Sequence, residues 1–266
     1  MTDLTLPAVR THLSGAGPGG DGEGEVRWIV FDRPSKLNAL TIADIREITR
    51  LVTDPGPGTR GLAFTGAGGR SFCAGVHTAT FLDLDPSRAR AFITELRDCL
   101  AAVRTSPLPT AAAVDGYCLG AGFELALACD VRLSTPDSQF GLPEVKVGIP
   151  SVIDAALLPS HVGLAMAKEI ILTGDPYPAS VMDRLGLLNR VVEADRLAEA
   201  TEELLGRMTR HTPVVLASQK RLFEIWHNRA LADAIDDSVD EFAAVFAAPE
   251  TLQQIRRYRS NSPKSP

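Results

Sequence analysis

The stretch that decides the fold reads D-G-Y-C-L-G-A-G-F-E-L-A-L-A-C-D, Asp115–Asp130. A short apolar strand, Thr110–Val114, leads into it, and the glycine-rich turn predicts a helix that begins near Gly120. The first N–H groups of a helix have no intrahelical partner, and the helix dipole adds partial positive charge there. Such an end can stabilise an oxygen that becomes negative during a reaction. Close helix packing is an alternative use of these glycines, and the sequence leaves both open.

Glu124 lies inside this predicted helix, which is apolar on nearly every side. A buried, unpaired carboxylate is costly, and such a group usually raises its pKa instead. A carboxyl group that burial keeps near neutrality can act as a general acid or base. The alternative is a structural ion pair, for which Arg132 is the nearest candidate in sequence.

A second glycine-marked turn, G-A-G-G-R-S-F-C-A-G-V-H at Gly66–His77, follows the predicted strand Gly61–Thr65. The small residues Ala74 and Gly75 let a ligand approach the main chain closely. No G-K-[ST] closes the turn, so it is not a phosphate loop of the Walker type. A tight surface turn is the alternative interpretation.

A second acidic residue, Glu144, lies in F-G-L-P-E-V-K-V-G-I-P at Phe140–Pro150. Because Pro143 cannot lie in a strand interior, Glu144 is predicted in a loop or in the first turn of a helix. An ordinary glutamate at a helix start remains the alternative.

Further elements are predicted on both sides of these segments. Apolar runs predict strands at 26–31, 61–65, 110–114 and 131–134. Helical spacing predicts helices at 42–53, 86–104 and 120–129, and then at 161–171, 178–186, 196–210, 213–228 and 229–247. Strands that alternate with helices before a helical tail predict an α/β core and a helical C-terminal region.

The first 25 residues are predicted to be a flexible lead-in. Their G-A-G-P-G-G-D-G-E-G run holds a formal G-x-G-x-x-G match at Gly15–Gly20. A dinucleotide-binding loop would follow a strand and open a helix, and here Pro18 and further glycines follow instead. We therefore reject a nucleotide site in this segment.

Composition excludes several classes of protein. The net charge is −6 and no basic stripe is present, so a nucleic-acid partner is not expected. The sequence contains no uninterrupted run of about 18 apolar residues, so no membrane span is predicted. No signal or transit peptide is recognised at the N-terminus. The four cysteines have neither C-x-x-C nor zinc spacing, which predicts no metal site and favours buried thiols in a reducing, cytoplasmic setting. Neither G-x-S-x-G nor H-E-x-x-H occurs, which argues against a serine hydrolase and a zincin.

Together these segments resemble the crotonase superfamily, whose type members are the enoyl-CoA hydratases. The resemblance covers about residues 26–259 and includes R-P-S-K-L-N-A-L (33–40), R-S-F-C-A-G-V-H (70–77), G-Y-C-L-G-A-G-F-E-L-A (116–126) and F-G-L-P-E-V-K-V-G-I (140–149). Two later segments, L-T-G-D-P-Y-P-A (172–179) and L-G-L-L-N-R-V-V (185–192), are also similar to the family.

The resemblance implies an α/β fold, a crotonase-like spiral of ββα units over residues 26–195. It also implies a helical C-terminal region, 196–266, that forms a trimer or a dimer of trimers. The substrate would be an acyl-CoA thioester, with no metal and no cofactor beyond the coenzyme A of the substrate. The residues expected to contact the substrate are Lys36, Leu37, Ala39, Ala74, Gly75, His77, Thr78 and Gly120.

The resemblance also implies roles in catalysis. The backbone N–H groups of Val76 and Ala121 would form an oxyanion hole for the thioester oxygen. Glu124 would orient and deprotonate the attacking water, and Glu144 would exchange the proton at the α-carbon. Two glutamates at these positions are typical of the hydratases, so the expected reaction is hydration of a 2-trans-enoyl-CoA to a 3-hydroxyacyl-CoA.

Three features depart from the family pattern. The run G-I-P-S-V-I-D-A-A-L at 148–157 is one residue shorter than usual and brings Asp154 into a segment that lines the acyl pocket of relatives, as a candidate third acid. His77 replaces a usual aspartate, and Ala121 stands where glycine is commoner. Because of these departures, Δ3,Δ2-enoyl-CoA isomerisation or acyl-CoA hydrolysis on the same site stays open, as does a non-catalytic acyl-CoA-binding protein.

Overall fold

A computed structural model of the chain describes residues 5–14 and 25–261. Its strands are β1 (Val9–Ser14), β2 (Glu25–Phe31), β3 (Thr59–Gly66), β4 (Ser71–Cys73), β5 (Thr110–Val114), β6 (Tyr117–Leu119), β7 (Val131–Ser134), β8 (Gln139–Gly141), β9 (Tyr177–Pro178) and β10 (Arg190–Val191). Its α-helices are α1 (Ile42–Thr53), α2 (Pro86–Thr105), α3 (Ala121–Ala128), α4 (Leu158–Val162), α5 (Leu164–Thr173), α6 (Ala179–Arg184), α7 (Leu197–Thr209), α8 (Pro213–Asn228), α9 (Leu231–Ala244) and α10 (Pro249–Asn261). Short 3-10 helices are η1 (Pro34–Lys36), η2 (Thr78–Phe81), η3 (Pro143–Val147), η4 (Ile153–Leu157), η5 (Ala194–Arg196) and η6 (Val245–Ala247).

The strands form two sheets, and from β3 to β8 successive strands belong alternately to one sheet and the other. The larger sheet has the order β1-β2-β3-β5-β7-β10, and the smaller has the order β4-β6-β8-β9. Strands β3, β5 and β7 are parallel neighbours in the larger sheet, and β4, β6 and β8 are parallel neighbours in the smaller. The chain therefore repeats a strand of each sheet and then a helix, as in β3-β4-α2 and β5-β6-α3. This repeat confirms the predicted spiral of ββα units.

Helix α1 shows how local sequence sets an element boundary. Thr41 and Asp44 form a capping box, in which the Thr41 side chain accepts from the Asp44 N–H and Asp44 accepts from the Thr41 N–H. Asp44 also pairs with the buried Arg33. Burial would raise the pKa of Asp44, but hydrogen bonds from Arg33, Thr41 and Ala8 outweigh it and lower that pKa. The start of α1 is therefore fixed in the core, beside the turn that precedes it.

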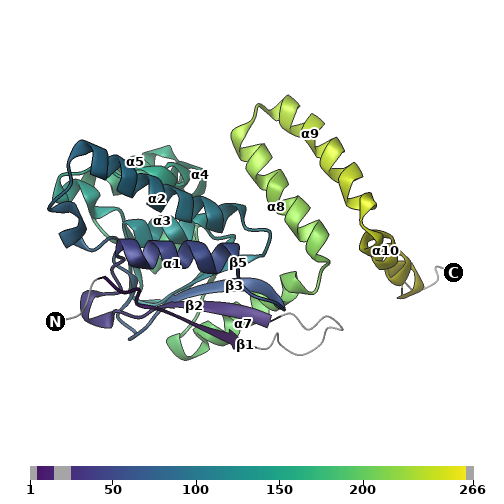
Figure 1. The fold of residues 1–266 in the computed structure, drawn as a ribbon, viewed down its shortest axis with the longest axis horizontal. Coiled ribbons are helices and arrows are strands. Elements are labelled where there is room, and N and C mark those ends of the chain that lie inside the picture. Colours follow the sequence, from purple (N-terminus) through teal and green to yellow (C-terminus); the bar gives the residue numbers. More distant parts are fainter. Residues whose placement is uncertain (1–4, 15–24, 262–266) are drawn as a thin grey trace.

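The larger sheet is covered on both faces (Figure 1). On one face, Ile29, Leu62 and Phe64 pack with the apolar sides of α1 and α2. On the other face, Trp28 and Ala63 pack with α7. Neighbouring strand residues thus point to opposite faces, as a sheet requires. The predicted domain boundary at residue 196 precedes α7, yet α7 packs as part of the core.

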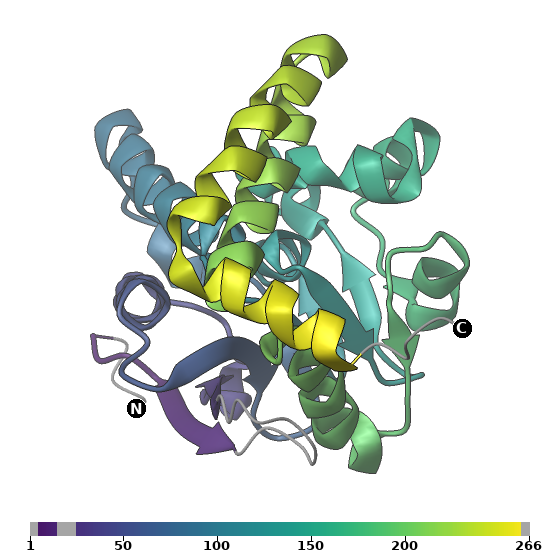
Figure 2. The ribbon, with the colours of Figure 1, turned by 90° about the vertical axis from the view of Figure 1, so that its right-hand side faces the viewer.

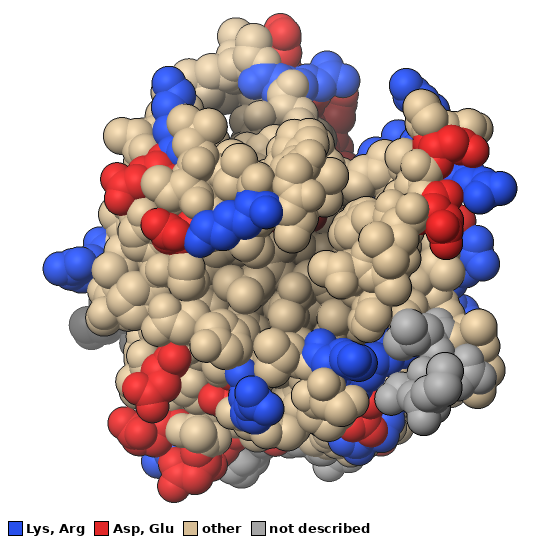
Figure 3. Space-filling model, turned by 90° about the vertical axis from the view of Figure 1, so that its left-hand side faces the viewer, with Lys and Arg blue, Asp and Glu red and all other residues tan. Residues whose placement is uncertain are grey.

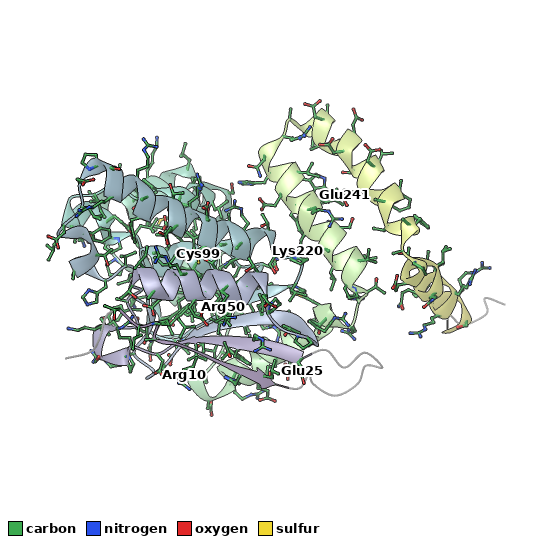
Figure 4. The ribbon with its side chains drawn as sticks, viewed as in Figure 1. Arg10, Glu25, Arg50, Cys99, Lys220 and Glu241 are labelled. Carbon is green, nitrogen blue, oxygen red and sulfur yellow. The ribbon has the colours of Figure 1, made fainter. Side chains whose placement is uncertain are left out.

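The helices after α7 extend away from the core. Helices α8 and α9 lie side by side, and α10 continues from the end of α9 (Figures 1 and 2). Lys220 of α8 reaches the core, where it binds Asp130 at 2.7 Å, and Glu241 of α9 binds Arg221 of α8 (Figure 4). The helices after α7 are therefore tied to the core mainly through α8.

Two predictions about the ends of the core need correction. Residues 9–14 form strand β1, which pairs antiparallel with β2, so a flexible lead-in over all of residues 1–25 is wrong. Alternating polar side chains on an edge strand gave no apolar signal there. The rejected glycine motif at 15–20 lies outside the described residues. The short strands β9 and β10 also interrupt the region predicted as almost purely helical after residue 161.

The surface carries both acidic and basic side chains. In the face drawn in Figure 3, uncharged residues occupy the middle, and acidic and basic side chains lie mostly toward the rim. Within the described residues, no helix combines the length and apolar character needed to cross a membrane.

Candidate active site

Two loops from successive turns of the spiral meet at Gly75 and Gly120. Strands β4 and β6 pair in parallel, with Cys73 opposite Cys118, so the loops that follow them begin side by side. A Cβ atom on Gly75 would lie 3.5 Å from the backbone nitrogen of Ala121, and one on Gly120 would lie 3.6 Å from the Cα of Gly75. Both glycines have positive φ, 91° and 53°. The backbone conformation favours glycine at both positions, and a Cβ atom would also crowd the Leu119 oxygen at 3.1 Å from Gly75 and the Glu144 Oε1 at 2.6 Å from Gly120.

Each loop presents a backbone N–H group next to this contact. Leu40 donates to the Gly75 oxygen and accepts from the His77 N–H, each at 2.8 Å, so the Val76 N–H between them points to the other side. Ala121 is the first residue of α3, so its N–H has no acceptor within the helix. Val76 and Ala121 both line one cavity.

The two glycines of the α3 turn have different uses. Gly120 faces the cavity, whereas a Cβ on Gly122 would collide with the carbonyl oxygen of Cys73 on β4. The packing interpretation is therefore confirmed for Gly122, whereas the oxyanion interpretation of the turn at Gly120 stays a prediction.

The cavity has a volume of about 180 Å³ and mostly apolar walls. It gathers eight of the residues predicted as site residues, namely Ala74, Gly75, Val76, Thr78, Gly120, Ala121, Glu124 and Glu144. The sequence did not identify the rest of the wall, which consists of Phe81, Phe92, Ile93, Leu96, Pro143, Lys146, Val147, Ile149, Pro150 and Val152. Helical spacing predicts an apolar side of α2 but does not distinguish a core face from a cavity wall.

Glu124 is 4% exposed and lies in the first turn of α3. Its Oε1 accepts a hydrogen bond from the Ala155 N–H at 3.2 Å. Burial, followed by the charges of Glu144 and Asp154, raises the pKa of Glu124 well above its usual value, and only the Ala155 bond opposes this. Glu124 therefore keeps its proton to higher pH than an ordinary glutamate, as a group that exchanges protons with a substrate requires.

An ion pair between Arg132 and Glu124 is not formed. The Arg132 guanidinium donates instead to the carbonyl oxygens of Leu187, Ala126 and Cys129, at 2.9, 3.1 and 2.7 Å. Arg132 thus stabilises the C-terminal end of α3. The structural alternative for Glu124 is wrong.

Glu144 reaches the cavity from η3, the predicted helical first turn. Its Oε2 accepts from the Ser151 hydroxyl at 2.8 Å, and a Cβ on Gly120 would lie 2.6 Å from its Oε1. Burial raises the pKa of Glu144, while hydrogen bonds from its own N–H and from Ser151 oppose the rise. The second carboxyl group therefore lies over the start of α3, beside the first.

Four of the predicted substrate contacts lie behind the loop and do not line the cavity: Lys36, Leu37, Ala39 and His77. The Leu37 oxygen accepts from the Ala74 N–H at 3.0 Å, and the Ala39 oxygen accepts from Arg33 at 2.9 Å. His77 Nδ1 accepts from the Ala79 N–H at 3.3 Å and so caps η2. Leu37 and His77 thus make contacts that support the loop of Val76, and the substrate contacts of all four residues stay a prediction.

Asp154 does not add a third acid to the cavity wall. Its two carboxyl oxygens both bind Arg104 Nη1 at 2.7 Å, and its neighbour Val152 lines the cavity instead. The backbone of Ile153, which lies between these two residues, has a φ of 55°. The candidate role of Asp154 as a third acid of the acyl pocket is therefore wrong.

Comparison with known proteins agrees with this geometry. The family model described as enoyl-CoA hydratase/isomerase matches residues 21–261. A mevalonyl-coenzyme A hydratase of Aspergillus fumigatus is 36% identical over 235 residues, 85% of each chain. A crotonyl-CoA hydratase of Syntrophomonas wolfei is 31% identical over 240 residues, 89% of this chain and 92% of that protein.

Solved structures give the same result. An enoyl-CoA hydratase from Bacillus anthracis superposes with a TM-score of 0.82 at 25% identity, covering 93% of this chain and 96% of that one. A protein titled a putative enoyl-CoA hydratase, from Streptomyces coelicolor, superposes with a TM-score of 0.86 at 28% identity, covering 97% and 93%. The fold is the crotonase fold, and by sequence along nearly its whole length the chain belongs to the enoyl-CoA hydratase/isomerase family.

Proposed function

We propose that this enzyme hydrates 2-trans-enoyl-CoA thioesters to 3-hydroxyacyl-CoA. The observation that carries the proposal is the meeting of four groups in one cavity: the N–H groups of Val76 and Ala121 and the carboxyl groups of Glu124 and Glu144. An isomerase needs one proton-transferring group, whereas addition of water needs two, one for the water and one for the α-carbon. Hydratase-named relatives at 31–36% identity support the same reaction.

In the proposed mechanism, Glu124 takes a proton from water and the resulting hydroxyl bonds to the β-carbon. The electron pair of the double bond moves toward the α-carbon and the thioester oxygen. The Val76 and Ala121 N–H groups stabilise the charge on that oxygen, each by on the order of 3 kcal/mol. Glu144 then donates a proton to the α-carbon, and the two carboxyl groups regain their starting protonation by exchange with solvent.

The proposed substrate is an acyl-CoA with an uncharged acyl chain. Phe81, Phe92 and Leu96 give the cavity an apolar wall opposite the carboxyl groups. The steps above require no metal and no cofactor beyond the coenzyme A of the substrate. The buried free thiols of the four cysteines support a reducing setting, and we propose the cytoplasm.

We also propose that the chain assembles as a homotrimer, alone or as a dimer of trimers. Helix α9 and its continuation carry large apolar side chains at helical spacing, and all are exposed: Leu231, Ile235, Val239, Phe242 and Phe246. An apolar stripe of this kind is typical of a protein interface. The proposed occupant is a second copy of this chain.

The function is tested by following the enoyl-thioester absorbance over a panel of short, medium and aromatic enoyl-CoA substrates. Glu124→Gln and Glu144→Gln should each lower kcat by about a hundredfold or more, since each removes a proton-transferring group. Mass spectrometry of the product separates the alternatives. Hydration adds one water and keeps the thioester, isomerisation keeps the mass, and hydrolysis releases free coenzyme A. Binding that survives both changes, without turnover in the unmodified protein, would indicate a non-catalytic binder.

A further inference from the structure

The 3-10 helix η4 makes two contacts in different directions. The backbone N–H of Ala155 donates a hydrogen bond to the Glu124 carboxyl group on α3 at 3.2 Å. From Asp154, the preceding residue, the side chain reaches Arg104 on α2, with both oxygens 2.7 Å from Nη1. One residue pair of η4 therefore connects the half-buried guanidinium of Arg104 to the carboxyl group proposed as the base.

The backbone just before this pair is strained. Ile153 has a φ of 55°, a left-handed conformation that is a genuine outlier for a β-branched residue. Such a conformation persists only where surrounding contacts determine it. Asp154 is held by its bonds to Arg104, and the Ala155 N–H is shared between the Val152 oxygen at 3.1 Å and the Glu124 Oε1 at 3.2 Å.

Arg104 itself is held from a third element. Its Nε binds Glu224 on α8 at 3.0 Å, so the guanidinium lies between two carboxylates. Lys220, one turn earlier on α8, anchors the same helix through Asp130 and the Leu108 oxygen at 2.7 and 3.0 Å. Arg104 is therefore fixed from both sides, and its position does not depend on η4 alone.

We propose that Arg104 and Asp154 are positioning residues for Glu124: their ion pair holds the Ala155 N–H against the Glu124 carboxyl group and neutralises the acidic charge beside it. The inference rests on the proposed function, in which Glu124 is the base that accepts a proton from water. Neither residue lines the cavity, so neither is expected to contact the substrate.

Charged groups face Glu124 from several elements. Glu144 of η3 and Asp154 of η4 both raise the pKa of Glu124. Arg104 of α2 acts on Asp154, and Cys73 of β4 and Cys118 of β6 flank α3 as neutral thiols, because burial raises their pKa values. The net charge of the Asp154–Arg104 pair therefore influences the pKa of Glu124, and substitutions at these two residues can change it.

The two single variants should act in opposite directions. Asp154→Asn removes a negative charge and leaves Arg104 less neutralised, so the pKa of Glu124 falls and the acidic limb of the kcat/KM profile moves to lower pH. Arg104→Gln leaves the Asp154 charge unopposed, so this limb moves to higher pH. We expect shifts of about one pH unit, and a fall in kcat of about tenfold at neutral pH with little change in KM.

The double variant Arg104→Gln with Asp154→Asn removes both charges and should return the limb toward that of the unmodified enzyme. Arg104→Lys keeps the positive charge but loses the planar guanidinium. Compared with Arg104→Gln, it should bring the acidic limb back toward its original pH more fully than it recovers kcat. Arg97→Gln is the matched control, because Arg97 lies on the same helix in an exposed pair with Asp98. It should change neither quantity.

A measurement independent of turnover separates this inference from the proposed function. Infrared titration follows the protonated carboxyl band of Glu124, assigned by its loss in Glu124→Gln, and its midpoint should move with the variants as the acidic limb does. Absence of hydration would overturn the proposed function. The infrared band of Glu124 would still show whether the Arg104–Asp154 pair affects its titration. Active enzyme whose band and limb stay fixed, or move the same way in both single variants, would overturn the positioning role alone.

Discussion

Gly120 lies directly beneath the carboxyl group of Glu144, so closely that a Cβ atom at position 120 would come within 2.6 Å of the Glu144 Oε1. The same glycine precedes Ala121 and has a φ of 53°. The N-terminal end of α3, the Glu144 carboxyl group and the loop of Gly75 therefore lie in close contact at Gly120. This relationship makes Gly120 a sensitive point of the site.

Gly120→Ala should displace the Glu144 carboxyl group and strain the turn. We expect kcat to fall by about a hundredfold, the size of the loss when a positioned acid or base is removed. Gly186→Ala is the matched control, since Gly186 also has a positive φ, 79°, but a Cβ there would meet nothing within 4 Å. Equal kcat losses in the two variants would show that backbone strain alone is responsible.

Glu124→Gln should stabilise the protein at neutral and alkaline pH although it removes activity. Burial raises the pKa of Glu124 in the folded state above the 4.5 of an unperturbed glutamate. Folded protein then binds more protons than unfolded protein, so stability falls as pH rises from 4.5 to the folded pKa. The uncharged amide avoids this loss. Thermal unfolding across pH should show a Tm difference that shrinks toward pH 4.5, and a constant difference would contradict the assignment.

Asn38→Ala should destabilise the fold by about 3 kcal/mol, because it removes a buried side chain that joins three segments. Asn38 accepts from the Arg33 N–H at 3.0 Å and donates to the Ala67 and Ser71 oxygens at 3.0 and 2.7 Å. Its φ is 56°, so Asn38→Gly, which tolerates this conformation, should be less damaging.

Denaturant unfolding measures both Asn38 variants. Asn228→Ala serves as the control, because its side chain is exposed and bonds only to the Glu224 oxygen of its own helix. A loss in Asn38→Ala no larger than in this control would mean that the buried bonds contribute little.

Leu96→Ala should extend the apolar wall of the cavity and shift preference toward longer enoyl chains. Each added methylene that the enlarged cavity buries is worth about 0.8 kcal/mol, or about fourfold in kcat/KM. The measurement is kcat/KM over a series of chain lengths. Leu100→Ala, one turn later on α2, removes an equally buried leucine that does not line the cavity. It should lower stability similarly without changing the preference.

Phe242→Asp should weaken the proposed assembly, because it introduces a charge into the exposed apolar stripe of α9. Light scattering at micromolar concentration should show a trimer or hexamer for the unmodified protein and smaller species for the variant. Leu172→Asp changes a comparably exposed leucine on α5, 71% against 68%, and should leave the mass unchanged. A monomeric unmodified protein would rule out the assembly.

Much of the core was predictable because its signals are local. The strands β5 and β7 and the helix α1 have the predicted bounds, 110–114, 131–134 and 42–53. Their apolar periods and the cap at Thr41 operate within a single element. Strand β1 was missed since an exposed edge strand carries no such period.

The sequence by itself determined the alternation of strands and helices, the glycine turns before Val76 and Ala121, and the presence of two glutamates in apolar surroundings. Only the tertiary structure decided that Glu124 is bound by Ala155, 31 residues away, and that Asp154 turns to Arg104, 50 residues away. The reason is physical: backbone propensity and periodicity act over neighbouring residues, whereas the partner of a buried charge is whichever group the packed elements bring within hydrogen-bond distance.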